Sequence, residues 1–416
     1  LSISLHRVGG GYQVGLSHND PRSKAQVAPL HGSTAIDAPA LQRLEAMPAA
    51  YGKALARQLF ADAAVVQRFV QVETAAQAAG CPLRVLVCID PSAPELQALR
   101  WELLRHPESG AALGTSETTP LSRFKVSRAG GPVKLRARAG LTALIAVPTP
   151  APAMLLGMGL APVDFTGEVA RVRAALGGIP VRTIGGPRSP CTLDRLIDEL
   201  RRGVDILYLI GHAVVARDTG VAALLLQDDA GAAKLVPCEA LAARIGELQK
   251  GPRLAVLAPC QSAGDGRQLA AAGRIAVQAT LASRLADAGV PAVLAMQGLI
   301  TKQTLAIMMP TFFSELQRDG QIDRALAVAR GKASERSDAW MPALYSSLPA
   351  GCLWYTQGFH GGEGKDVWRS LLAPVARGKV VPILGPGLLE AAHGSSHDTA
   401  RRLAGAHHYP MAAHEW

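Results

Sequence analysis

The sequence "RLAVLAPCQSAG" (residues 253–264) is an apolar run that stops abruptly at Cys260. Short, continuously apolar runs predict strands buried on both faces, and the small and polar residues that follow predict a strand end. A second run, "VDILYLIGHA" (residues 204–213), closes in the same way on His212. Two interpretations of Cys260 follow: it is the last buried residue of a core strand, or a nucleophile held at the end of that strand.

Strand-like and helix-like segments alternate on both sides of this stretch. Because parallel strands need crossover helices, the alternation predicts an α/β fold with a mostly parallel sheet between layers of helices. The expected hairpin covers residues 222–236, with its turn near Asp228. The expected strands cover residues 83–89, 141–148, 204–213, 253–260 and 292–299, and the expected helices cover residues 93–104, 167–178, 192–203 (with Thr192 as N-cap), 238–249, 279–289, 304–320 and 322–331.

The segment before this alternation has a different pattern. Residues 1–17 alternate apolar and polar side chains around three glycines at positions 9–11, which predicts a β-hairpin. Helical periodicity follows over residues 39–78. We therefore expect an N-terminal hairpin and helical region over residues 1–80, with a regulatory or dimer-forming role.

Composition limits the classes of protein. With 416 residues, two or three domains are expected, and hydrophobic residues at 49% suffice for a large core. No uniformly apolar stretch reaches the length of a membrane span. The sequence starts at Leu1 rather than Met and has no basic segment before an apolar one, so we expect no signal peptide and a start inside a longer protein. The formal net charge is +10, but arginines are interleaved with acids, and no basic run with aromatics favours nucleic-acid binding. Six cysteines without a CxxC pair predict a reduced, cytoplasmic protein.

Cys260 and His212 have the spacing of a nucleophile and its base. His212 lies 48 positions before Cys260, which leaves room for a hairpin, a helix and a strand, so the two strands can be neighbours in one sheet. An imidazole near a thiol favours the thiolate, which is the attacking form. Main-chain N–H groups of Cys260 and Ala213 are candidates for stabilising an oxyanion. A buried structural cysteine and a satisfied core histidine are the competing interpretation.

Several ordered motifs resemble the CHAT family, caspase-like cysteine peptidase domains of bacteria. They are "DILYLIGHA", "LAVLAPCQSAG", "LASRLADAGVPAVLAMQG", "FFSELQRDGQIDRALAVAR", the upstream "ELQALRWELL" and the closing "DAWMPALYSSLPAGCLWY". The resemblance covers roughly residues 50–356. It implies a caspase-like cysteine endopeptidase fold, with His212 as general base and Cys260 as nucleophile.

Two residues depart from the family pattern beside this dyad. The family usually has glycine directly after the histidine, where this chain has Ala213, and a small residue before the cysteine, where it has Pro259. Alanine serves at position 213 if the backbone there has an ordinary φ, and is strained if φ is positive. Pro259 removes one N–H group, though not that of Cys260.

Substrate selection is marked only weakly. The resemblance implies a pocket lined from strand ends beside the dyad, and Asp205, Asp265 and Gln297 are the candidates for lining it. An acid there would select lysine or arginine. Asp228 and Asp229 lie in the same neighbourhood, but a hairpin turn explains them equally well.

The end of the chain carries a glycine-rich turn, "VVPILGPGLLE" (residues 380–390). It resembles the opening of a sirtuin-like NAD-binding domain, which implies cofactor contact at Gly385 and Gly387 in a parent protein only; a tight turn is the alternative. No cofactor is expected for this chain. No metal site is expected either, because the spacing of the terminal histidines does not suit one. They are His393, His397, His407, His408 and His414.

We therefore expect residues 81–356 to form a CHAT caspase-like peptidase domain, followed by a linker over residues 357–378 and the truncated start of a sirtuin-like domain over residues 379–416. The expected function is cysteine-type hydrolysis of peptide bonds in a protein or peptide substrate, in a regulated bacterial effector whose activity is latent. Sensor or effector domains of the same parent protein are the expected partners, with no membrane. The alternatives are an inactive caspase-like scaffold for protein–protein interaction, and an NAD-handling module.

Overall fold

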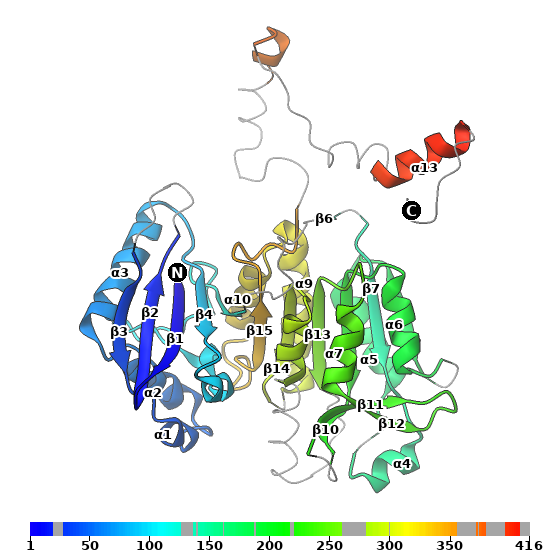
Figure 1. The fold of residues 1–416 in the computed structure, drawn as a ribbon, viewed down its shortest axis with the longest axis horizontal. Coiled ribbons are helices and arrows are strands. Elements are labelled where there is room, and N and C mark those ends of the chain that lie inside the picture. Colours follow the sequence, from blue (N-terminus) through cyan, green and yellow to red (C-terminus); the bar gives the residue numbers. More distant parts are fainter. Residues whose placement is uncertain are drawn as a thin grey trace. The chain divides into compact units, whose positions relative to one another are not determined.

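The computed structural model describes residues 1–19, 28–125, 136–138, 140–160, 162–186, 189–216, 220–259, 280–298, 300–355, 372, 374–379 and 396–407. The chain divides into two compact units (Figure 1). The first comprises residues 1–134 and 141–353, and the second comprises residues 135–140 and 354–416. The second unit contains the short parallel pair β6 (Arg136–Ala137) and β16 (Trp354–Tyr355) and the helix α13 (Ser396–Ala406).

In the described part of the first unit, eleven strands form one sheet in the order β3-β2-β1-β4-β5-β15-β14-β13-β9-β7-β8. Figure 1 shows the N-terminal strands in blue and cyan at one end of this sheet and the green strands at the other. The strands are β1 (Ser2–Val8), β2 (Gly11–Ser17), β3 (Leu30–Thr34), β4 (Val85–Ile89), β5 (Leu121–Phe124), β7 (Ala143–Val147), β8 (Val181–Gly185), β9 (Ile206–Gly211), β13 (Leu254–Pro259), β14 (Ala292–Met296) and β15 (Pro342–Ser346).

Apart from the antiparallel strands β1, β2 and β3 at one end, the direction of the strands changes once, near the middle of the sheet. Strands β14, β13, β9, β7 and β8 are parallel to one another, and so are β1, β4, β5 and β15, but β14 and β15 pair antiparallel. We call β1–β5 the N-terminal half of the sheet and β7, β8, β9, β13 and β14 the C-terminal half. Most neighbours are parallel and helices flank the sheet, which confirms the predicted fold class. The N-terminal hairpin of β1 and β2 is also confirmed, and β1 extends the main sheet by pairing with β4.

Each half has its own apolar core. In the N-terminal half, β1, β2 and β4 pack with α2 (Pro48–Leu59) and α3 (Ala63–Ala78), around buried side chains such as Leu5 and Phe69. In the C-terminal half, one face of β7, β9, β13 and β14 packs against α6 (Leu193–Arg201) and α7 (Cys238–Gly246). The apolar runs that predicted buried strands form this second core.

Apart from the helix predicted over residues 93–104, the predicted helices and the hairpin over residues 222–236 are present. The short helix α1 (Ala38–Gln42) precedes α2, and residues 280–287 are helical. Thr192 caps α6 as expected, because its hydroxyl accepts a hydrogen bond from the Arg195 N–H at 3.2 Å. The other elements are α4 (Pro152–Gly157), α5 (Phe165–Leu176), α9 (Lys302–Asp319), α10 (Ile322–Lys332) and a small sheet of β10 (Ala213–Val215), β11 (Ala222–Gln227) and β12 (Ala233–Pro237).

The helix predicted over residues 93–104 is wrong. The segment forms two short 3₁₀ turns, η1 (Pro94–Ala98) and η2 (Trp101–Leu103). The Arg123 guanidinium donates hydrogen bonds to this segment's carbonyls, at 2.7 Å to Gln97 O and 2.8 Å to Leu99 O. Those carbonyls are therefore satisfied without continuing an α-helix, a tertiary contact that local periodicity does not reveal.

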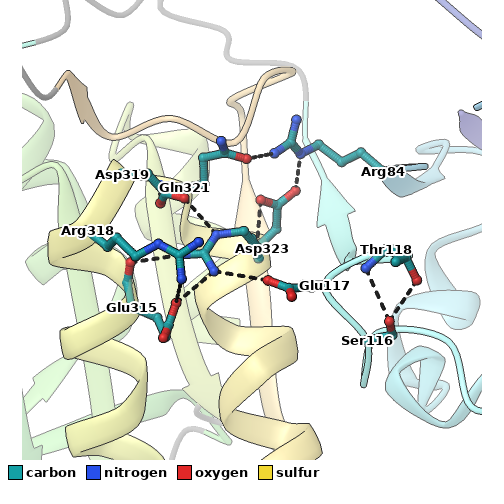
Figure 2. A network of polar contacts seen from close by, with 10 residues as sticks. Arg84, Ser116, Glu117, Thr118, Glu315, Arg318, Asp319, Gln321 and Asp323 are labelled. Carbon is teal, nitrogen blue, oxygen red and sulfur yellow. Dashed lines mark hydrogen bonds and ion pairs between the residues drawn. The ribbon is translucent and has the colours of Figure 1, made fainter. Parts of the chain in front are cut away.

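Charged side chains join the N-terminal half to the turn between α9 and α10 (Figure 2). Arg84, one residue before β4, pairs with the buried Asp323 of α10 and donates to Gln321 Oε1 at 2.7 Å. Arg324 pairs at 2.7 Å with both Glu315 and Asp319. The network thus connects residues more than 200 positions apart in the chain.

Candidate active site

The strands predicted to carry the histidine and the cysteine are neighbours. β9 and β13 pair in parallel, and their last residues, Gly211 and Pro259, are partners in the register. His212 directly follows Gly211, and Cys260 directly follows Pro259. Cys260 itself lies outside the described residues. The described backbone therefore brings the two strand ends that precede the predicted dyad to the same level of one edge, which we call the dyad edge.

His212 is held in a tight change of direction between the main sheet and the small one. It lies between β9 and β10, it is 6% exposed, and its carbonyl accepts the Leu225 N–H at 2.9 Å. That bond makes His212 and Leu225 a hydrogen-bonded pair, so the next pair, Ala213 with Leu224, is of the other type. The Ala213 N–H therefore faces away from β11, and its extended conformation is one that alanine adopts without strain.

The other five cysteines are described and form no disulfide. Burial raises the pKa of the Cys191 thiol to about 12 and those of Cys88 and Cys238 to about 11. Burial also raises the pKa of Cys352. A thiol needs the opposite shift to become a nucleophile near neutral pH, so these four are structural residues.

Gln297, a predicted pocket residue, follows β14 at the dyad edge, but its side chain is already engaged. Arg123 donates to its Oε1 at 2.7 Å, and its own amide donates to the Glu102 carboxylate. Gln297 is 9% exposed. Its amide is therefore part of a buried polar cluster, and this position supports a positioning role for Gln297 rather than contact with substrate.

The cluster under Gln297 is organised by a buried ion pair. Arg123 of β5 and Glu102 of η2 pair at 2.8 Å, with side chains 4% and 1% exposed. Burial alone would raise the pKa of Glu102, but the Arg123 guanidinium outweighs it and the pKa is lowered. Burial opposes the charge of Arg123 as well, and Glu102 reverses this, so its pKa is raised. Both groups are thus charged at neutral pH. The sequence signal for this pair was an acid inside the apolar segment "RWELL".

Asp205, a second predicted pocket residue, lies at the other end of β9 from His212. Its carboxylate accepts the Thr142 N–H at 3.0 Å and lies 3.7 Å from Arg253. Six strand residues separate it from His212, a distance of about 20 Å. This location argues against the predicted pocket role. Its position before a strand instead gives it a structural role, holding the starts of β7, β9 and β13 together.

The remaining predicted residues lie in the turn at Asp228 and in segments outside the described residues. Asp228 does form the predicted turn, because its carboxylate accepts the Ala232 N–H at 2.8 Å, and Asp229 beside it is exposed. Asp265, the third pocket candidate, lies outside the described residues, as do Gly385 and Gly387.

Gln227 is a residue near the dyad edge that the sequence did not single out. Its Oε1 accepts the N–H groups of Thr149 at 3.1 Å and Cys191 at 3.0 Å, and its amide donates to the Thr149 carbonyl at 3.1 Å. Gln227 is 3% exposed. It fixes the loop after β7 to the start of α6, beside the β9 end. A glutamine that closes the apolar run "AALLLQ" was the only signal.

In the part of the chain that the structure describes, no group of three or more histidine, cysteine, aspartate or glutamate side chains has the arrangement of a metal site. Within the same residues, every helix is too short or too polar to cross a bilayer.

Comparison with known proteins identifies the family of this chain. The family model described as "CHAT domain" matches residues 49–349, which is most of the chain. The protein therefore belongs to the CHAT domain family, and the resemblance stated from the sequence motifs is confirmed. A search of curated proteins finds no match.

Solved structures with weak similarity include two bacterial proteinase structures and one from yeast. The Arg-specific cysteine proteinase gingipain R (RgpB) is 11% identical with a TM-score of 0.40, over 72% of this chain and 70% of that one. The complex of the Porphyromonas gingivalis RgpB pro- and mature domains gives 12% and 0.38, over 71% and 70%. The Saccharomyces cerevisiae separase–securin complex gives 12% and 0.36, over 64% of this chain and 16% of that one. The family-model match ends at residue 349, so it gives no support to a sirtuin-like start over residues 379–416.

Proposed function

We propose that the protein is a cysteine peptidase that uses Cys260 and His212 as a dyad. The observation that carries the proposal is the pairing of Gly211 with Pro259. Because these residues are partners in neighbouring parallel strands, His212 and Cys260, which come next in the sequence, follow strand ends at the same level. Membership in the CHAT domain family supports the same assignment. Catalytic residues collect at the carboxyl ends of parallel strands in α/β sheets. In the sequence, His212 and Cys260 each come directly after the last residue of such a strand.

In the proposed reaction, His212 takes the thiol proton and the Cys260 thiolate attacks the carbonyl carbon of a peptide bond. The tetrahedral oxyanion is stabilised by main-chain N–H groups, among them that of Ala213, which faces away from β11. His212 then donates the proton to the leaving amine as the C–N bond breaks. Water, deprotonated by His212, hydrolyses the thioester and releases the acid and the free thiol.

The extended conformation of Ala213 bears on the scaffold alternative. That alternative rested on the replacement of glycine by Ala213 and on Pro259 before the cysteine. Since residue 213 lies in a strand, alanine meets no left-handed strain there. Pro259 is the last residue of β13, where a missing N–H costs the fewest ladder bonds.

The test is cleavage of a mixed peptide library by the whole chain, with products identified by mass spectrometry. Cleavage by the wild type, loss in Cys260→Ala and retention in Cys352→Ala would support the dyad, because Cys352 is a half-buried thiol away from it. Labelling of Cys260 by an electrophilic peptide ketone supplies a second readout. Equal, zero cleavage and zero labelling in the wild type and Cys260→Ala would favour the scaffold.

A further inference from the structure

A pocket of about 180 Å³ lies between α5 and α9, over the sheet. The two helices are joined near their C-terminal ends, where Gln317 donates to the Leu176 carbonyl at 3.0 Å. The pocket lies between residues 168–175 of α5 and residues 302–310 of α9, with Tyr208 and Ile210 of β9 and Ala258 of β13 among its lining. We call this space the α5–α9 wedge.

The wedge lies next to the dyad edge. Helix α9 follows β14, and α5 follows β7, so both helices begin on the side where these parallel strands end. Ile210 and Ala258 lie two positions before His212 and Cys260, and two strand residues span about 7 Å. A substrate residue whose carbonyl is attacked at the dyad edge therefore has its side chain within reach of the wedge.

The lining of the wedge is mostly apolar, and three of its residues carry charge: Glu168, Arg171 and Lys302. Glu168 is 7% exposed and already pairs with Arg171, and Lys302 adds a second cation. A lysine or arginine side chain would meet two cations and one carboxylate that is already neutralised, so the wedge does not suit it. Burial raises the pKa of Tyr208, which marks the floor as poorly hydrated. The apolar lining is Val172, Ala174, Ala175, Ile210, Ala258, Leu305, Ala306, Met309 and Pro310.

The volume limits which apolar side chains fit. An apolar protein cavity of about 150 Å³ accommodates benzene, so about 180 Å³ has room for a leucine, methionine or phenylalanine side chain. Alanine would leave most of the space empty, and a substrate's aspartate or glutamate would lose its hydration to an apolar interior.

We propose that the α5–α9 wedge receives the side chain of the residue before the scissile bond and selects leucine, methionine or phenylalanine there. This inference rests on the proposed peptidase function. It differs from the selectivity for lysine or arginine that an acidic pocket would give.

The test uses the whole chain with peptides that differ only at the residue before the cleaved bond. The wild type should prefer leucine, methionine and phenylalanine over lysine, arginine and aspartate. Ala175→Met fills the wedge from α5 and should lower kcat/KM for the leucine peptide about tenfold or more relative to the alanine peptide. Ala170→Met, at an exposed position of the same helix, should leave that ratio unchanged.

Failure of the inference and failure of the peptidase function give different results. Cleavage after basic or acidic residues, or an unchanged leucine-to-alanine ratio in Ala175→Met, overturns the wedge assignment while the peptidase stands. No cleavage of any peptide and no labelling of Cys260 in the wild type overturns both. If Ala175→Met does not fold, Ala306→Met, at an exposed position of the wedge lining, replaces it with the same expected shift.

Discussion

Each half of the sheet has a buried histidine in a connection beside its strands, but the two have different surroundings. In the N-terminal half, His106 pairs with Glu73 at 2.8 Å and accepts two backbone N–H groups at its Nδ1. In the C-terminal half, His212 follows a strand end beside the strand that precedes Cys260. The first histidine closes a local loop, whereas the second lies where two parallel strands end and where we propose the dyad. Similar burial thus accompanies an observed structural role in one case and a proposed catalytic role in the other.

The largest expected effect contrasts these two histidines. His212→Gln should lower kcat/KM for a cleavable peptide by about 10²- to 10⁴-fold, because it removes the proposed general base. His106→Gln should leave kcat/KM within about twofold and lower the free energy of unfolding by about 1–2 kcal/mol through lost hydrogen bonds. Peptide cleavage and urea denaturation of both variants measure the contrast. Equal activity losses in the two variants would remove the functional distinction between the halves.

The next effect concerns the ion pair that the N-terminal half places under Gln297. Glu102→Ala leaves the buried Arg123 charge unpaired and should cost about 3–5 kcal/mol in urea denaturation. Replacing both partners, as Glu102→Leu with Arg123→Met, should recover much of that loss. If the single and the double variant are equally unstable, shape rather than charge makes the pair important.

The same pair predicts a response to acid. The pKa of Glu102 is lowered in the folded protein, so the folded state binds fewer protons than the unfolded state. The stability from this group is present above the ordinary glutamate pKa, about 4.3, and is lost as pH falls through the lower folded value. Denaturation midpoints measured between pH 7 and pH 3 should fall, and Glu102→Gln should show a shallower fall. Parallel curves for the two proteins would contradict this assignment.

A smaller effect is expected where the two halves are linked by charge (Figure 2). Asp323→Asn removes the charge that pairs with Arg84, and because Asp323 is 2% exposed the cost should be about 1–3 kcal/mol. Asp198→Asn breaks an exposed helical pair with Arg201, 62% and 64% exposed, and should cost less than about 0.5 kcal/mol. Thermal unfolding of the two variants provides the comparison, and a larger shift in Asp198→Asn would contradict it.

The C-terminal half was largely predictable because its information is local. Buried parallel strands have continuous apolar sequences, so β9, β13 and β14 could be located from the sequence. The residues that follow these strands then indicated which edge of the sheet is the candidate active site. The N-terminal half was harder to predict. β5 is only four residues long. Its Arg123 can be buried because it donates hydrogen bonds to Glu102 and to two carbonyls of another segment. No periodicity within "LSRF" indicates such partners.

The pocket candidates show the same limit. Asp205 is an acid near the dyad in the sequence, and Gln297 follows a predicted strand, but these positions do not reveal their contacts. Asp205 lies at the opposite end of β9 from His212, and the amide of Gln297 is hydrogen-bonded to Arg123 and Glu102. The α5–α9 wedge is built from helix faces that are distant in sequence and individually unremarkable. Only the packing of α5 against α9 brings their small side chains together.

The central position of β15 has a consequence for how the chain is made. β15 (Pro342–Ser346) fills the gap between β5 and β14, and it pairs with β5 across about 220 intervening residues. During synthesis from the N-terminus, both β5 and β14 therefore keep one unpaired edge until this late segment emerges. Exposed strand edges recruit other chains, and contacts of such long range form slowly. A nascent or truncated chain that ends before residue 342 presents two adhesive edges, so assembly of the sheet is completed by one of its last strands.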